Sequence, residues 1–234
     1  MNDTRKIEFQ WKRIIFHSGW GWLAIPVALL LQKGMLSVGQ LDIFIYGVML
    51  PITIIVDLMR PILYWSNLRW KWMEKNKYLN LLLLLEKWFV GIKILREKER
   101  LRYSGMGMYL IGIITVYSFF QFYIGVIAVM ILAFGDPIAS IVGKAYGTPY
   151  DSLDGKSYEG VVSFVAGSFI IIILLVSFFD SLSLPFFPVD FTMWEKVRII
   201  SVGTVIGSIV EVKAGSLDNL LIPIITAIVM TLLI

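Results

Sequence analysis

The residues best suited to chemistry lie within one stretch, 134–160, which reads FGDPIASIVGKAYGTPYDSLDGKSYEG. Asp136 stands at the edge of an apolar run, where an acid is a candidate functional residue because an ionised carboxylate costs about 2.5–3.5 kcal/mol at the centre of a membrane helix. Lys144, Lys156 and Glu159 follow it. Phosphate chemistry uses this combination, because carboxylates hold a hard divalent cation and lysines neutralise phosphate oxygens. We therefore predict a phosphate site with Asp136, Lys144 and Lys156 as catalytic residues.

Small residues follow Asp136 at helical spacing. They are Ala139, Ser140, Gly143 and Gly147. Spacings of three and four place them on one face of a helix. A narrow face of this kind lets a phosphate chain approach the backbone, and it equally lets a second helix pack closely in a small-xxx-small seam. The neighbouring charged residues favour the phosphate-binding interpretation.

The sequence contains no complete P-loop, no G-x-S-x-G and no H-E-x-x-H motif. Gly155-Lys156-Ser157 has the form of a P-loop ending, but that motif needs a glycine at position 150, which is Tyr150. Lys156 can still bind phosphate as a point charge. With no cysteine and one histidine, thiolate and His-rich metal sites are excluded. That histidine, His17, is either a membrane-interface residue or a base.

Further acids occur near the ends of other apolar runs. They are Asp57, Glu97, Glu211 and Asp218, the last followed by Asn219. Each alone is explained by an ion pair at a membrane interface, but together they bring carboxylates from separate segments to one face of the membrane. We predict that Asp136, Asp218 and Glu211 hold Mg²⁺ or another divalent cation. Asp57, Glu97, His17 and Asn219 form a supporting set of candidates.

The composition indicates an integral membrane protein. Of the 234 residues, 58% are hydrophobic and only 16% charged, whereas about a quarter are charged in soluble domains. The apolar residues gather into runs long enough to cross a bilayer. We expect an all-α, polytopic membrane bundle forming a single domain over 1–234, with about seven transmembrane helices. The expected spans are 14–32, 40–58, 107–120, 123–142, 160–179, 197–212 and 218–234.

The segment 79–95 decides the predicted orientation. It opens with leucines but carries charges in its second half. If it lies on the cytoplasmic surface as an amphipathic helix, all Lys and Arg except Lys33, Lys196 and Arg198 face the cytoplasm. Short loops follow this bias, so we predict a cytoplasmic N-terminus and a cytoplasmic active site.

Aromatic and basic residues alternate over 64–78. The alternation is compatible with nucleic-acid binding, and also with amphipathic rings and cations at the lipid headgroups. Because so much of the chain is apolar, we favour the headgroup belt. We expect the lipid bilayer as a partner and no nucleic acid.

Four sequence blocks together resemble the CTP-dependent lipid-alcohol kinases, which include dolichol kinase, phytol kinase and the yeast-type diacylglycerol kinase. In chain order the blocks are 95–99 with 105–112, then 135–144, 155–160, and Glu211 with 217–223. They are similar to the family's L-R-x-x-E stretch before a G-x-x-x-Y span, its acid-headed, glycine-ended helix, its K-[ST]-x-x-G element and its closing E…D-N-[LF]-x-[IV]-P block. One departure occurs near the start, where the family often has R-K-x-x-H. Here Arg13 takes the arginine place and Ile14 the lysine place.

The resemblance implies transfer of the γ-phosphate of CTP to a membrane lipid alcohol, of the dolichol or polyprenol type or the diacylglycerol type. The implied nucleotide contacts are Arg13, Ser140, Gly143, Gly147, Lys156, Ser157, Glu159 and Gly160. Two alternatives stay open. A CTP:phosphatidate cytidylyltransferase would make a CDP-lipid, and a small transporter would carry acids spread across the bilayer depth. Gly203 and Gly207 could pack within the chain or between subunits, so the oligomeric state is not predicted.

Overall fold

The computed structural model describes residues 30, 47, 51, 105–148 and 156–234. Several predictions fall outside these residues. They are the spans 14–32 and 40–58 apart from residues 30, 47 and 51, the surface helix 79–95, and the candidates Arg13, His17, Asp57 and Glu97.

The described residues form an all-helical structure without a strand. Its elements are α5 (Gly105–Phe119), α6 (Phe122–Ala145), α7 (Tyr158–Ser181), α8 (Met193–Lys213), the 3₁₀ turn η5 (Gly215–Leu217) and α9 (Asp218–Thr231). Each α-helix contains most of one of the apolar runs expected from 107 onward, with ends that differ by a few residues. The predicted all-α class is therefore confirmed for this part of the chain.

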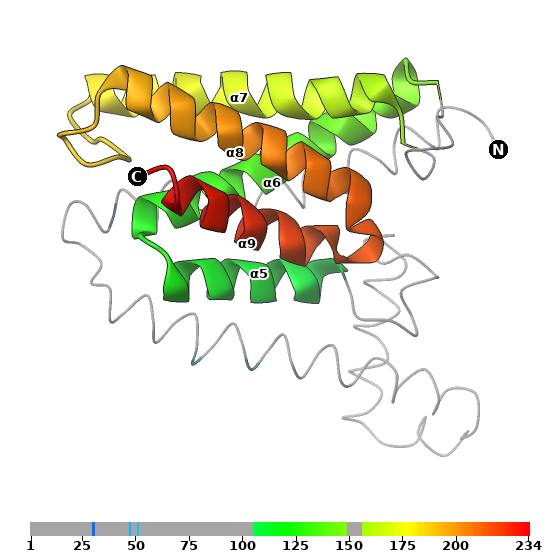
Figure 1. Ribbon diagram of the computed structural model, residues 1–234, viewed down its shortest axis with the longest axis horizontal. Coiled ribbons are helices and arrows are strands. Elements are labelled where there is room, and N and C mark those ends of the chain that lie inside the picture. Colours follow the sequence, from blue (N-terminus) through cyan, green and yellow to red (C-terminus); the bar gives the residue numbers. More distant parts are fainter. Residues whose placement is uncertain (1–29, 31–46, 48–50, 52–104, 149–155) are drawn as a thin grey trace, which may run out of the picture.

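Successive helices run in alternating directions, and α6 lies among the others and packs against α5, α7, α8 and α9 (Figure 1). Every residue of α6 from Ile124 to Gly135 is buried. A helix that is apolar on all sides is stable only when others surround it, and α6 has that composition. The antiparallel order brings the end of α6 and the starts of α7 and α9 to the same end of the bundle, together with the end of α8.

Two helices, α6 and α7, are long and apolar enough to cross a membrane. Each has 24 residues, which corresponds to about 36 Å of helix. In contrast to α6, α7 exposes a ridge of large hydrophobic side chains with a spacing of four or eight. The ridge consists of Tyr158, Val162, Ile170, Leu174 and Phe178, and Leu182 continues it directly after the helix. A ridge of this kind suits contact with lipid chains.

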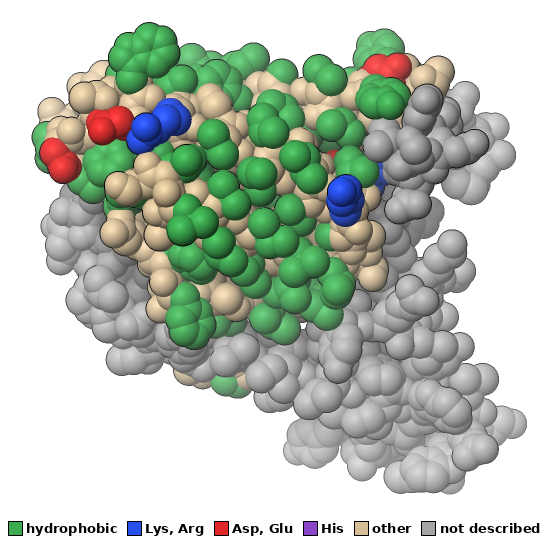
Figure 2. Space-filling model, viewed as in Figure 1, with side chains coloured by type: hydrophobic (Ala, Val, Ile, Leu, Met, Phe, Trp, Pro, Cys, Tyr) green, Lys and Arg blue, Asp and Glu red, His purple; other side chains and the backbone are tan. Residues whose placement is uncertain are grey.

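Charged side chains lie at the two ends of the described bundle. Figure 2 shows them toward opposite sides of the view, with a largely hydrophobic surface between them. At the end opposite the start of α7, Lys196 Nζ lies 2.6 Å from Asp180 Oδ2. At the same end, an Arg198 guanidinium N–H donates to the carbonyl of Leu233 at 3.0 Å. These two contacts connect α8 to α7 and to the C-terminal residues that follow α9.

The start of α8 is held by a capping box. The Thr192 hydroxyl accepts a hydrogen bond from the Glu195 N–H at 3.3 Å, and Glu195 Oε2 accepts one from the Thr192 N–H at 2.7 Å. We expect Thr192→Ala to lower the stability by about 0.5–2 kcal/mol, because it removes an N-cap acceptor. Thermal unfolding in detergent measures this change. Thr192→Ser keeps the hydroxyl and should unfold close to wild type, so an equal loss in both variants would contradict the assignment.

Candidate functional site

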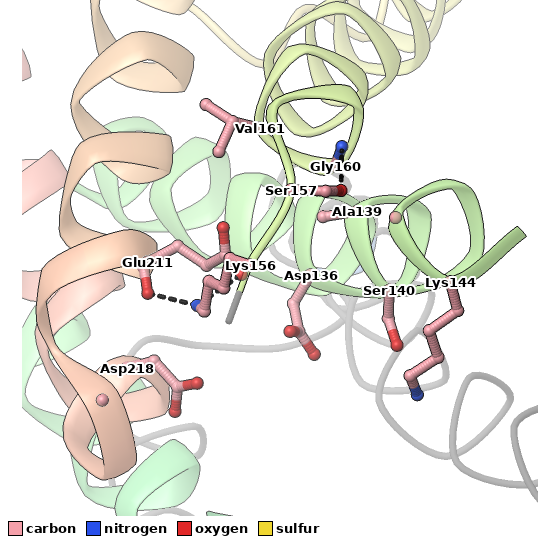
Figure 3. A pocket seen from close by; sticks show the side chains of 12 residues that line it. Asp136, Ala139, Ser140, Lys144, Lys156, Ser157, Gly160, Val161, Glu211 and Asp218 are labelled. Atoms are coloured by element: carbon pink, nitrogen blue, oxygen red, sulfur yellow. Dashed lines mark hydrogen bonds and ion pairs between the residues drawn. The ribbon is translucent and has the colours of Figure 1, made fainter. Parts of the chain in front are cut away.

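A cavity of about 290 Å³ with several charged side chains in its lining lies at the end of the bundle where α7 and α9 begin (Figure 3). Its lining residues come from α6, from the start of α7, from the end of α8 and from the turn into α9. They are Asp136, Ala139, Ser140, Gly143, Lys144, Lys156, Ser157, Gly160, Val161, Glu211, Gly215 and Asp218. The cavity therefore gathers charged residues from four separate parts of the sequence.

The small face predicted on α6 divides into two neighbouring stripes. Asp136, Ser140 and Lys144 are spaced by four and point to the cavity side of the helix (Figure 3). Ala139 and Gly143 lie next to them and contact the start of α7, where the Ala139 carbonyl and the Gly143 Cα lie close to Gly160. The helix-packing interpretation is therefore confirmed for Ala139 and Gly143, which also line the cavity, and the phosphate-binding interpretation stays a prediction.

Three glycines allow this close approach of α6 and α7. A Cβ built at Gly143 would lie 3.0 Å from Ser157 Oγ, and one at Gly160 would lie 3.2 Å from the Ala139 carbonyl oxygen. A Cβ at Gly147 would overlap Ser157 and the Gly143 carbonyl. Gly147 lies beyond the end of α6 and does not line the cavity, so its predicted place on the same helical face is wrong.

Ser157 has a structural use in addition to lining the cavity. Its buried hydroxyl caps α7 by accepting a hydrogen bond from the Gly160 N–H at 3.1 Å. Ser157→Ala would remove both this cap and a cavity hydroxyl, so its effect would not separate the two uses. Glu159, two residues on, is not among the lining residues. The structure therefore does not bring Glu159 to the cavity with the other predicted nucleotide contacts.

Lys156 and Glu211 both line the cavity and form an ion pair with each other. The Lys156 ammonium lies 2.6 Å from Glu211 Oε1, and it also donates to the backbone carbonyl of Glu211. The Glu211 side chain is 7% exposed and the Lys156 side chain 29%. Burying an ionised carboxylate is costly unless a close cation compensates its charge, and Lys156 supplies such a cation. In this arrangement Glu211 is engaged by a cation of the protein itself.

Asp136 and Asp218 approach the cavity from different helices, and their carboxylates point into the same space in Figure 3. Across the described part of the chain, no three acidic or histidine side chains converge tightly enough to form a metal site by themselves. Two carboxylates are nevertheless a donor set that suits Mg²⁺, which commonly combines one or two carboxylates with water and substrate phosphates. The residues present therefore fit a cation that arrives with a nucleotide.

Asn219 connects two helices. It is buried, and its side-chain N–H donates to the Gly105 carbonyl at 3.0 Å, which joins the start of α9 to the start of α5. The Asn219 backbone N–H donates to Asp218 Oδ1 at 2.8 Å. Asn219 thus supports the position of Asp218 and is not itself among the cavity-lining residues.

Two lining residues, Val161 and Gly215, were not predicted. Gly215 has φ of 57°, follows the last residues of α8 and precedes α9. A glycine in the left-handed conformation just after a helix is a common C-terminal signal, so the sequence contained a usable indication of this turn. No signal in the sequence marks Val161 as a cavity residue.

The cavity brings together most of the predicted site residues that the structure describes. It unites Asp136, Ser140, Gly143, Lys144, Lys156, Ser157, Gly160, Glu211 and Asp218, whereas Gly147, Glu159 and Asn219 lie outside its lining. The arrangement offers two lysines, three carboxylates and a closely packed glycine backbone at one end of an apolar bundle. No protein-family model matches the chain, and no curated protein or solved structure matches it significantly.

Proposed function

We propose that this protein is an integral membrane phosphotransferase that moves the γ-phosphate of CTP to the hydroxyl of a membrane lipid alcohol. The observation that carries the proposal is the cavity at one end of the apolar bundle, where Asp136, Lys144, Lys156 and Asp218 meet. The choice of CTP, and of a dolichol, polyprenol or diacylglycerol type of acceptor, rests on the sequence resemblance alone.

The membrane setting is part of the proposal. Three observations support a helical bundle that crosses the bilayer. They are the two helices of spanning length, the exposed apolar ridge on α7, and the charged side chains toward the two ends in Figure 2. Further spans, up to the expected seven, come from the sequence pattern. The excess of Lys and Arg before residue 104 supports a cytoplasmic N-terminus. The cavity would then face the cytoplasm, where nucleotides are available.

The proposed chemistry assigns separate tasks to the lysines and the acids. Lys144 and Lys156 would neutralise the oxygens of the terminal phosphates, which favours transfer because negative charge is spread over these oxygens in the transition state. Asp136 and Asp218 would hold Mg²⁺, whose charge further neutralises the phosphate chain. A cavity carboxylate would accept the proton of the lipid hydroxyl. The bond from the γ-phosphorus to its bridging oxygen breaks, a bond to the lipid oxygen forms, and CDP leaves.

The position of the charges also bears on the alternative functions. A transporter predicts ionisable residues along a path through the bilayer. The charged side chains seen in Figure 2 lie toward the two ends of the described bundle, and α6 is apolar from Ile124 to Gly135, the residue before Asp136. This distribution favours an enzyme at one membrane face. A cytidylyltransferase would use the same groups, so it is distinguished by its products.

The proposal predicts a specific labelling result. Purified protein in detergent, given γ-labelled CTP, Mg²⁺ and a panel of lipid alcohols, should transfer label to at least one lipid, and chelation of Mg²⁺ should stop the transfer. Reactions with γ-labelled ATP, and with micelles that lack the alcohol, serve as controls. Incorporation of label from α-labelled CTP into phosphatidate would instead establish the cytidylyltransferase. A folded protein that transfers neither label would contradict both enzymatic functions.

A further inference from the structure

We propose that Glu211 is a positioning residue that orients the ammonium of Lys156 toward the bound phosphates and does not itself hold the metal. The inference rests on the proposed function, because it assigns a task within the same cavity. Two oxygen atoms of Glu211, Oε1 and the backbone carbonyl oxygen, both accept hydrogen bonds from the Lys156 ammonium.

The first observation is the double contact. Lys156 Nζ donates to Glu211 Oε1 at 2.6 Å and also to the backbone carbonyl of Glu211. A lysine ammonium has three N–H donors, so these two contacts leave one donor for a ligand. Lys156 lines the cavity, and Figure 3 shows its amino group in the space that Asp136 and Asp218 also face. The third donor is therefore available where phosphate oxygens would lie.

The second observation is the place of Glu211 at the end of a helix. Glu211 belongs to the last turn of α8, which ends at Lys213. Carbonyls in the last turn lack partners within the helix and attract cations. Lys156 supplies such a cation to the Glu211 carbonyl. The backbone of α8 thus fixes one of the two contacts, which makes the orientation of the ammonium insensitive to small movements of the Glu211 side chain.

The third observation is the difference in exposure between the partners. The Glu211 side chain is almost fully covered, whereas that of Lys156 remains partly accessible. Lys156 precedes α7 and carries a flexible four-carbon stem, so its own backbone does not determine where the ammonium lies. Glu211, 55 residues away in sequence, does so. The buried Glu211 therefore holds the Lys156 side chain in place, while the Lys156 ammonium remains accessible from the cavity.

A double-mutant cycle tests the inference on the full chain in detergent. The proteins are wild type, Glu211→Gln, Lys156→Met and the double variant, and the measurement is equilibrium binding of CTP with Mg²⁺. Glu211→Gln should weaken nucleotide binding about tenfold, which corresponds to loss of one charge-assisted contact. The double variant should bind no worse than Lys156→Met, because Glu211 acts only through the lysine. Half-saturating Mg²⁺ should stay within about twofold of wild type in Glu211→Gln.

Each contrary outcome has a defined meaning. Additive losses in the cycle, or a Mg²⁺ requirement raised about tenfold in Glu211→Gln, would overturn the positioning role and restore Glu211 as a metal ligand. Wild-type protein that binds no nucleotide would overturn the proposed function together with this inference. Nucleotide binding with an additive cycle would overturn the inference alone.

Two further variants guard the test against loss of folding. Glu211→Asp keeps the charge but shortens the side chain, so it should weaken binding with a Mg²⁺ dependence like that of wild type, and it replaces Glu211→Gln if that variant unfolds. Lys213→Met removes a charge from the same end of α8 outside the cavity lining. It should bind the nucleotide like wild type. A loss in Lys213→Met equal to that in Lys156→Met would contradict a specific role for the Lys156–Glu211 pair.

Discussion

Asp136→Asn should abolish phosphate transfer while the protein remains folded. Asparagine has nearly the volume of aspartate but is neutral, so it can neither balance a divalent cation nor accept a proton. Loss of one group that stabilises transition-state charge typically slows an enzyme by about a hundred- to a thousandfold, and we expect at least the upper value here. Initial rates with γ-labelled CTP measure the effect, and size-exclusion chromatography with thermal unfolding measures the fold.

The matched control is Asp190→Asn, which makes the same chemical change at an exposed position in the connection between α7 and α8. It should leave transfer unchanged. Full activity of Asp136→Asn, in a protein shown to be folded and to bind nucleotide, would remove Asp136 from the proposed mechanism. Loss of folding in Asp136→Asn alone would show instead that this acid has a structural role.

Gly135→Ala should destabilise the bundle, although it adds only one methyl group. A Cβ at Gly135 would lie 2.5–2.7 Å from three carbons of the Phe164 ring, and Phe164 is fully buried. Overpacking in a closely packed core typically costs about 1–3 kcal/mol. We expect a lower unfolding temperature in detergent. Because the next residue is Asp136, we also expect slower phosphate transfer in the protein that remains folded.

Two variants show whether the Phe164 ring is the cause. Gly125→Ala makes the same change elsewhere in buried α6, where the nearest side-chain atoms are 3.2 Å from the new Cβ, so its loss should be smaller. The double variant Gly135→Ala with Phe164→Leu should be more stable than the sum of the two single losses predicts, because the shorter side chain makes room for the methyl group. If the stability losses of the two single variants add up strictly in the double variant, the Phe164 ring is not the cause of the destabilisation by Gly135→Ala.

The positions of the helices could be predicted because each buried helix needs a continuous apolar run. The runs 123–142 and 160–179 lie within α6 and α7. The ends of the helices could be predicted less well, because local capping residues determine where a helix begins and ends. Ser157 caps α7 and Thr192 caps α8, so both helices begin before their apolar runs.

The composition of the site could be predicted in part. Residues close in sequence, such as Asp136, Ser140 and Lys144, were grouped correctly because helical spacing determines which side chains share a face. The contact between Lys156 and Glu211 could not be predicted, since it joins segments 55 residues apart and depends on how α7 and α8 pack. Helical periodicity also could not show that α6 ends before Gly147.

The unequal lengths of the helices have a consequence for the bilayer in the proposed membrane setting. α9 has 14 residues, about 21 Å of helix, whereas α6 and α7 have 24 each and a hydrocarbon core is about 30 Å thick. Such hydrophobic mismatch is relieved when the lipid layer thins beside the short helix. Because α9 begins at the cavity residue Asp218, the thinning would fall beside the cavity. The protein would thus bring the headgroup plane toward its site, and a lipid hydroxyl would need to rise less far out of the membrane to meet the nucleotide.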